Sequence, residues 1–140
     1  MGLALRKEGI EHIDTNILVR LITRDDEKQL KKVLKLLSHK EKLYVFEDSA
    51  MMEVVFVLSG KTYQYSREKI AAKIKSIFQL PNIVCNKSVI EGALDVYVKH
   101  PKLSFTDCYL AIVTDASGEA PLWTLDHKLA SQCPVAKEIP

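Results

Sequence analysis

The amino-acid sequence predicts an α/β domain with a mainly parallel sheet. Short apolar runs, which are typical of buried strands, alternate along the chain with longer segments whose apolar residues recur at helical spacing. The chain has 140 residues, of which 47% are hydrophobic and 27% are charged, and these values are typical of one globular domain. We therefore expect residues 10–140 to form a single domain and residues 1–9 to form a flexible leader.

The expected strands are short and apolar. They cover residues 10–13, 43–46, 83–85 and 122–125, and a last strand begins near Val135. Helices separate them in sequence, so parallel neighbours with right-handed crossovers are expected.

The expected helices are marked by amphipathic stripes and by capping residues. The clearest covers residues 26–38, with apolar residues on one face and lysines on the other. Hydroxyl side chains are expected to cap four helices: Ser49, Ser66, Ser88 (in a capping box with Glu91), and Ser104 or Thr106. The other expected helices cover 16–23, 50–58, the stripe from Ile70 to Phe78, the segment from Ser88 to before Pro101, 107 to about 115, and 127–131.

Cysteine usage and hydropathy bear on the compartment. The three cysteines, Cys85, Cys108 and Cys133, form no C-x-x-C pair, which argues against a disulfide scaffold or a zinc site. No apolar stretch is long enough to cross a membrane, and the first residues do not resemble a signal peptide. We expect a cytoplasmic protein without membrane contact.

The formal net charge is only +2, but basic residues are concentrated in two stretches. They are Lys28, Lys31, Lys32, Lys35, Lys40 and Lys42, followed by Lys61, Arg67, Lys69, Lys73 and Lys75. Each stretch fits a solvated helix face, and each also fits a surface that binds nucleic acid.

Four acidic residues lie within or just after apolar runs: Asp14, Glu53, Asp107 and Asp126. Three of them have a local explanation, because Asp14, Asp107 and Asp126 each stand where a helix begins and can cap it. Glu53 does not complete a capping box from Ser49 and is the only charged residue from Ala50 to Leu58; the alternative is that it points to solvent from a narrow polar stripe with Ser49. If the strands are parallel, these helix starts converge at one end of the sheet, where ligands bind. Carboxylates that converge there would repel one another unless a cation neutralised them. Oxygen ligands favour Mg²⁺ or Mn²⁺.

Other chemistries fit the sequence less well. There is no G-x-S-x-G elbow of a serine hydrolase and no glycine-rich phosphate loop. Cys108 has no histidine at a supporting spacing, so a buried structural thiol is the better interpretation.

Taken in order, the four acidic contexts resemble the PIN domain, the nuclease domain of VapC-type toxins. The matching segments are 13–20, 52–58, 104–111 and 122–129, and the resemblance extends over nearly the whole chain from about Ile10. It implies a parallel five-stranded sheet and hydrolysis of RNA phosphodiester bonds with Mg²⁺ or Mn²⁺. By position Asp14, Glu53, Asp107 and Asp126 match the family's acidic cluster, Asn16 matches a residue that orients the first Asp, and Thr124 matches a hydroxyl near the last acid.

Roles for these residues follow from the resemblance and from metal chemistry. Asp14 and Asp107 are expected to contact the metal directly, while Glu53 and Asp126 bind through water or complete a second metal site. Arg20 and Arg24 lie on the helix opened by Asp14; they are candidates to contact RNA phosphates, with solvent-facing charge as the alternative.

The partners implied by the resemblance are an RNA substrate, a second copy in a homodimer and a small antitoxin protein. The sequence leaves two alternative functions open. One is a catalytically idle module that uses the same fold to bind RNA or a protein, and the other is an RNA-processing nuclease that is not a toxin.

Overall fold

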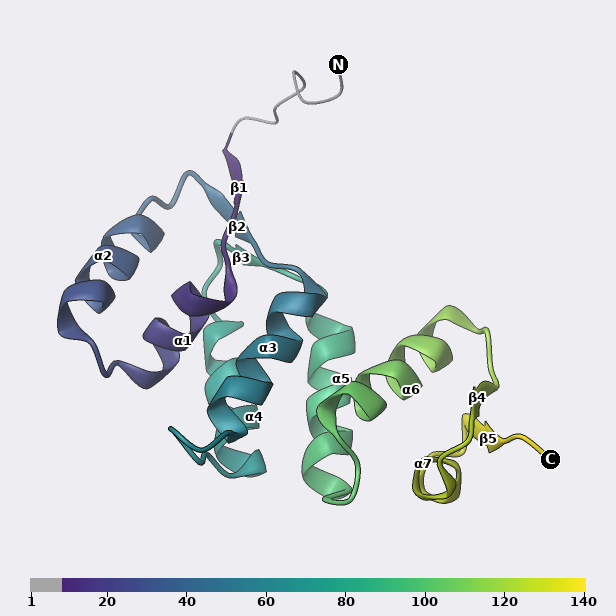
Figure 1. Ribbon diagram of the computed structural model, residues 1–140. Coiled ribbons are helices and arrows are strands. Elements are labelled where there is room, and N and C mark those ends of the chain that lie inside the picture. The colour runs from purple at the N-terminus through teal and green to yellow at the C-terminus, as the bar shows by residue number, and fades with distance from the viewer. Residues whose placement is uncertain (1–8) are drawn as a thin grey trace, which may run out of the picture.

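The computed structural model describes residues 9–140, so the expected leader lies outside the described residues except for Gly9. Seven helices and five short strands alternate along this part of the chain, as an α/β fold requires (Figure 1). The strands are β1 (Ile10–His12), β2 (Leu43–Val45), β3 (Ile83–Val84), β4 (Leu122–Thr124) and β5 (Ala136–Glu138). The helices are α1 (Thr15–Thr23), α2 (Glu27–Leu37), α3 (Asp48–Ser59), α4 (Arg67–Ile77), α5 (Lys87–Lys99), α6 (Phe105–Ser117) and α7 (His127–Gln132).

Side-chain caps explain where several helices begin. Asp14 caps α1 by accepting from the Ile17 N–H, and Ser66 caps α4 as predicted. Ser104 and Asp107 form the expected capping box at the start of α6. The predicted caps at Ser49 and Ser88 are wrong. Helices α3 and α5 begin earlier, at Asp48 and Lys87, and no side chain caps either of them.

The predicted single five-stranded sheet is wrong, because the strands form two separate parallel sheets. One has the order β1-β2-β3 and the other pairs β4 with β5. Ile10 aligns with Leu43 in the first sheet, and Leu122 aligns with Ala136 in the second. Each sheet therefore ends in strands that have only one neighbour.

The main core lies between the three-stranded sheet and helices α1 to α5. Tyr44 on β2 is fully buried there, and its hydroxyl donates to the Leu36 carbonyl at 2.8 Å. Phe46 stacks on Phe78 with ring centroids 6.4 Å apart. The stripe expected on α4 is confirmed, since Ile70 and Ile74 are buried. Burial of this apolar surface is the main stabilising contribution to the fold.

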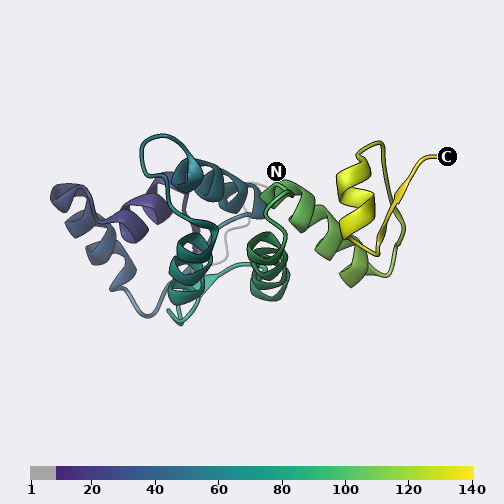
Figure 2. The same cartoon turned by 90° about the horizontal axis from the view of Figure 1, so that it is seen from below.

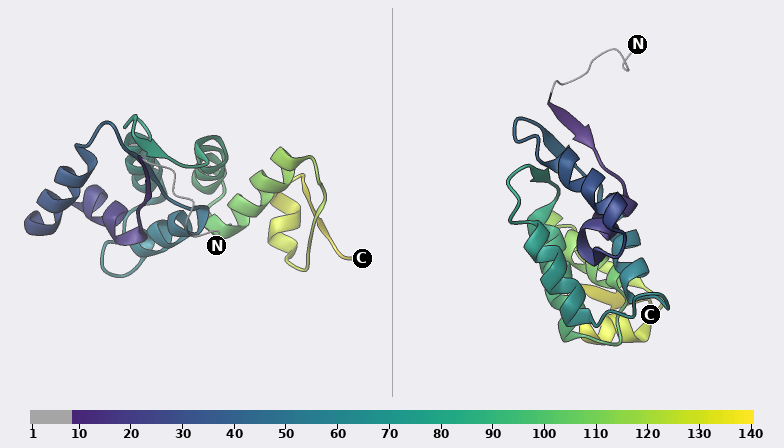
Figure 3. Two further views of the ribbon diagram at one scale, coloured as in Figure 1. Left: turned by 90° about the horizontal axis from the view of Figure 1, so that it is seen from above. Right: turned by 90° about the vertical axis from the view of Figure 1, so that its left-hand side faces the viewer.

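Helix α6 connects the core to the C-terminal part of the chain. Figures 1 and 2 show it starting beside α5 and leading away to a small unit of β4, α7 and β5 at the far end of the molecule. The same separation is visible from above in Figure 3. We call this segment, residues 122–138, the C-terminal unit. The molecule is thus elongated, with α2 at one end and the C-terminal unit at the other, and β4 lies well apart from β1.

Within residues 9–140, no helix combines the length and apolar character needed to cross a bilayer.

Candidate functional site

The start of α1 and the middle of α3 meet through one hydrogen bond. The Thr15 hydroxyl donates to Oε2 of Glu53 at 3.1 Å, across 38 positions of sequence. Asp14, the residue before Thr15, is exposed and uses Oδ1 to cap α1. Glu53 is exposed as well, so its carboxylate is not desolvated by the core. The structure therefore brings the two predicted acids Asp14 and Glu53 to neighbouring positions.

The first turn of α6 lies next to the same part of α3. The Thr106 hydroxyl is 4.0 Å from the sulfur of Met52, the residue before Glu53. Asp107 follows Thr106, and its Oδ2 accepts from the Ser104 N–H at 3.3 Å. The capping box holds Asp107 at this position, because its backbone N–H also donates to the Ser104 hydroxyl.

Asp126 is not with the other three acids. It caps α7 by accepting from the Lys128 and Leu129 N–H groups, and it lies in the C-terminal unit. Thr124 has a positioning contact there, since its hydroxyl accepts from the Asp126 N–H at 2.9 Å. The chain thus places Asp14, Glu53 and Asp107 on adjoining elements and carries Asp126 away from them, into the C-terminal unit.

The four acids have the oxygen donors that a hard divalent cation prefers, but they are not gathered around one point. Each is an oxygen donor, and the capping bonds described above engage one oxygen of Asp14, of Asp107 and of Asp126. Among the residues that the structure describes, however, no three acidic, histidine or cysteine side chains lie close enough to hold a metal ion together. The donor set fits Mg²⁺ or Mn²⁺, while one copy in this conformation does not assemble it.

Comparison with protein families gives a match to the PIN domain over residues 12–133, which include all four acids, strands β2, β3 and β4, and the last residue of β1. The chain belongs to the PIN domain family. Members of this family are generally metal-dependent nucleases. No curated protein matches the chain closely enough to be counted as a relative.

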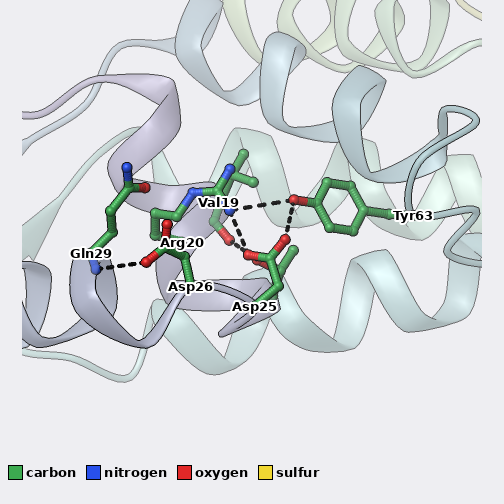
Figure 4. A network of polar contacts seen from close by, with 7 residues as sticks. Val19, Arg20, Asp25, Asp26, Gln29 and Tyr63 are labelled. Atoms are coloured by element: carbon green, nitrogen blue, oxygen red, sulfur yellow. Dashed lines mark hydrogen bonds and ion pairs between the residues drawn. The ribbon is translucent and has the colours of Figure 1, made fainter.

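In this PIN domain, Arg20 is part of a polar network rather than a free cation (Figure 4). Its Nη1 lies 2.5 Å from Oδ1 of Asp25 and 3.4 Å from the Tyr63 hydroxyl. Tyr63 also donates to Oδ2 of Asp25 at 2.7 Å, and the Thr23 hydroxyl lies 2.7 Å from Oδ1. The bonds from Tyr63 and Thr23, together with the Arg20 charge, lower the pKa of Asp25 to about 2. Arg20 therefore ties α1 to the loop after α3, and it has less freedom to contact RNA than the sequence suggests.

Arg24 and Asn16 are more accessible than Arg20. Arg24 is exposed at the end of α1, in the left-handed conformation with φ of 55°, and it lines a hollow together with Lys73 of α4. Asn16 is exposed in the first turn of α1 and lines a groove that Arg20 and Lys32 of α2 also border. Basic side chains thus adjoin α1 at two places, Lys32 near its first turns and Arg24 with Lys73 at its end.

The second basic stretch is not one solvated face. Arg67 points inward, and its Nη1 lies 2.9 Å from the Tyr97 carbonyl and 2.7 Å from the Leu103 carbonyl. Lys75 pairs with Asp95 at 2.5 Å. Sequence reasoning gave no sign of these contacts, because each joins residues 20 or more positions apart.

Cys85, Cys108 and Cys133 are free thiols. Cys108 is buried beside Asp107, and burial raises its pKa to about 12. A thiol that keeps its proton is a poor nucleophile, so the interpretation of Cys108 as structural agrees with its surroundings.

Sequence reasoning also missed Thr15 and Tyr109. The Thr15 bond to Glu53 is long-range, and its only local sign is the position directly after Asp14. The Tyr109 hydroxyl donates to a carboxylate oxygen of Asp48 at the start of α3. That bond stabilises the neutral phenol and raises the pKa of Tyr109 to about 12. It also helps to fix α6 against α3.

Proposed function

We propose that this PIN domain is a Mg²⁺- or Mn²⁺-dependent endoribonuclease that hydrolyses RNA phosphodiester bonds, and that it is the toxin of a toxin–antitoxin pair. The observation that supports the proposal is that the three helices next to which or on which Asp14, Glu53 and Asp107 stand (α1, α3 and α6) adjoin one another, through the Thr15–Glu53 bond and the Thr106–Met52 contact. Membership of a family of metal-dependent nucleases supports it.

The chemistry assigned to the site is attack of water on a phosphodiester. A divalent cation bound there lowers the pKa of that water and neutralises charge on the phosphate. Asp14 and Asp107 are the proposed direct ligands. Glu53, held by Thr15, and Asp126, held by Thr124, are the proposed water-mediated or second-site ligands. Asn16 is proposed to orient Asp14.

The RNA backbone is proposed to follow the basic side chains beside α1. Arg24 and Lys32 are exposed there, and phosphate contacts of this kind weaken steeply as salt rises. Arg20 is proposed to contribute mainly by holding this region in shape, because Asp25 and Tyr63 already engage its guanidinium. A small antitoxin that masks the acids is the expected regulatory partner.

A cleavage assay with two matched variants tests the proposal. Asp14→Asn and Asp26→Asn each replace an aspartate that caps a helix, since Asp26 caps α2 through the Gln29 N–H. Asparagine caps about as well as aspartate, so both variants should fold equally well. We expect Mg²⁺-dependent cleavage of RNA by the original protein and by Asp26→Asn, and none by Asp14→Asn. Equal cleavage by all three would show that Asp14 is not a ligand.

A thermal melt with and without several millimolar Mg²⁺ or Mn²⁺ separates binding of the metal from catalysis. A rise in melting temperature that Asp14→Asn abolishes and Asp26→Asn retains is the expected result. If neither metal shifts any of the three proteins and RNA is not cut, the metal-dependent nuclease is refuted.

One observation favours a second candidate, a catalytically idle module that binds RNA or a protein. Within the described residues, the acids do not form a group able to hold a metal. Salt-sensitive RNA binding without cleavage, unchanged by Asp14→Asn, would establish that candidate. Cleavage restricted to a precursor RNA, without growth arrest on expression, would instead identify an RNA-processing nuclease that is not a toxin.

A further inference from the structure

Four strands end the two sheets that the structure describes, and two of them, β1 and β4, have open edges that a single parallel pairing could fill. In the first sheet β1 pairs only with β2, and in the second β4 pairs only with β5. Parallel strands are normally buried by neighbours and by helices on both faces. Here all three residues of β1 are exposed, and Trp123 in the middle of β4 is 57% exposed. Open edges with exposed apolar side chains are features that folded proteins usually cover.

The backbone groups on these two edges are complementary. The Gly9 carbonyl and the Ile13 N–H bond to β2, so the backbone groups of Ile10 and His12 face the open edge, because alternate residues of a parallel strand bond to the same neighbour. On β4, Leu122 and Thr124 bond to the strand beside it, so Trp123 and Leu125 face the open edge. In a parallel pair with Ile10 beside Leu122 and His12 beside Thr124, the free backbone N–H and C=O groups of the two edges hydrogen-bond to one another.

The same register brings acids together. Asp14 stands two residues after the end of β1, and Asp126 stands two residues after the end of β4. With His12 beside Thr124, the two aspartates lie side by side at the carboxyl edge of a joined sheet. This is the edge where α1 begins and where Glu53 is held by Thr15.

Within one chain, the position of α6 prevents this pairing. Its 13 residues carry the chain about 20 Å along the helix axis, away from β1. The four residues from Gly118 to Pro121 then span at most about 14 Å before β4 begins.

Packing against α5 and α3 holds α6 in that position. Its Phe105, Cys108 and Ala111 are buried, Phe105 packs edge-to-face on Tyr97 of α5, and Tyr109 bonds to α3. While these contacts persist, the β4 that fills the edge of β1 has to come from another molecule.

We propose that two copies of this chain exchange their C-terminal units, so that β4 of each copy pairs with β1 of the other. Each copy then receives Asp126 from its partner beside its own Asp14, Glu53 and Asp107. The exchange gives the dimer two five-stranded sheets, each made of β1, β2 and β3 of one copy and β4 and β5 of the other. The catalytic consequence, that each site is complete only in the dimer, rests on the proposed nuclease function, whereas the exchange itself does not.

Mixing two inactive variants tests the catalytic consequence. Asp14→Asn and Asp126→Asn are each expected to lack Mg²⁺-dependent cleavage. When they are unfolded and refolded together, a mixed dimer pairs the intact Asp14 of one chain with the intact Asp126 of the other. Random pairing should restore roughly a quarter of the original activity, since half of the dimers are mixed and each has one intact site.

Mixing Asp14→Asn with Glu53→Gln is the matched control. Both residues lie outside the C-terminal unit, so no mixed dimer contains an intact site and no activity should return. Cleavage by the original protein, with no recovery from the Asp14→Asn and Asp126→Asn mixture, would overturn the exchange and leave the nuclease proposal standing.

A cross-link tests the exchange without any activity. In a Cys85→Ser background, chains with Glu11→Cys are mixed with chains with Trp123→Cys, refolded together and oxidised. The proposed register puts these two positions side by side, within the separation that a disulfide spans. We expect a covalent dimer from the mixture and far less from either variant alone.

Mass measurement by light scattering completes the test. A dimer at micromolar concentration together with the cross-link supports the exchange even if the protein cuts no RNA, in which case only the nuclease proposal fails. A monomer, or the absence of a covalent dimer from the oxidised mixture, overturns the exchange.

Discussion

Arg67 is the side chain whose removal should most disturb the region that holds Asp107. It is the first residue of α4, and its Nη1 lies 2.9, 3.3 and 2.7 Å from the carbonyls of Tyr97, His100 and Leu103. Its guanidinium carbon lies 4.0 Å from the centre of the Tyr97 ring. One cation therefore holds the end of α5 and the loop that leads to the capping box of α6.

The size of the effect follows from these contacts. One nitrogen has two N–H groups, so at most two of the three carbonyls are well bonded at once, and each charged bond is worth about 1.5 kcal/mol. The stacking on Tyr97 adds about 0.5 to 1 kcal/mol. We expect Arg67→Ala to lower the free energy of unfolding by about 3 to 4 kcal/mol, which for a domain of this size is a fall of roughly 10 °C in melting temperature. Arg67→Lys keeps the charge but loses the planar fork, so about half of that loss is expected.

Urea unfolding and thermal melts measure these losses, and Lys69→Ala is the matched control. Lys69 is on the same helix and lies 3.9 Å from the Tyr65 ring, but it is exposed, so its removal should cost only about 0.5 to 1 kcal/mol. Hydrogen exchange should speed up most at the amides of Leu103 to Cys108. If Arg67→Ala is no less stable than Lys69→Ala, the guanidinium does not hold the end of α5 and the loop before α6, and the reasoning fails.

Three further predictions concern titration and backbone strain. Tyr63→Phe should destabilise the protein by about 1 kcal/mol at pH 7. Because Asp25 has a pKa of about 2 in the folded state, below its ordinary 3.8, its contribution is present above the ordinary value and lost as the pH falls toward 2, so unfolding of Tyr63→Phe and of the original should converge in acid. Gln64 has φ of 51°, and Gln64→Gly should raise the midpoint of urea unfolding by relieving strain worth up to about 1 kcal/mol; a lower midpoint would contradict this. Glu138 raises the pKa of His127 above 6.5, so this contact stabilises the protein below that pH and is lost as the pH rises through the folded pKa; Glu138→Gln should return the histidine, followed by NMR, to an ordinary titration.

Local signals in the sequence predicted the elements well. The serine at position 66 and the isoleucines one turn apart after it defined α4, and Ser104 with Asp107 defined the start of α6. Where prediction failed, a serine resembled a cap but is the second residue of the helix. Ser49 in α3 and Ser88 in α5 are the two cases, and in neither helix does a side chain cap the first turn.

The contacts that shape the candidate site cannot be predicted from the spacing of residues in the sequence. The bond from Thr15 to Glu53 and the inward turn of Arg67 join residues 30 or more positions apart, so only the folded chain reveals them. The sequence did place Asp14, Asp107 and Asp126 at helix starts: Asp14 and Asp126 are N-caps, and Asp107 completes the capping box of Ser104. It could not show that Asp126 lies apart, because strand pairing depends on where α6 directs the chain.

The open edge of β1 can be filled in two ways, by β4 of the same chain or by β4 of a second copy. If α6 released its contacts with α5, the chain would lose the burial of Phe105 and Cys108 in order to fill its own β1 edge. If a second copy fills that edge, the burial on α6 is kept and the open edges of β1 and β4 both gain backbone hydrogen bonds. Exchange therefore keeps the apolar burial on α6 and also forms the new backbone hydrogen bonds, whereas closure within one chain loses that burial. Exchange costs the entropy of association. That cost falls as protein concentration rises, so the fraction of dimer and the activity per molecule that depends on it should both increase with concentration. Closure within one chain would instead give a constant activity per molecule.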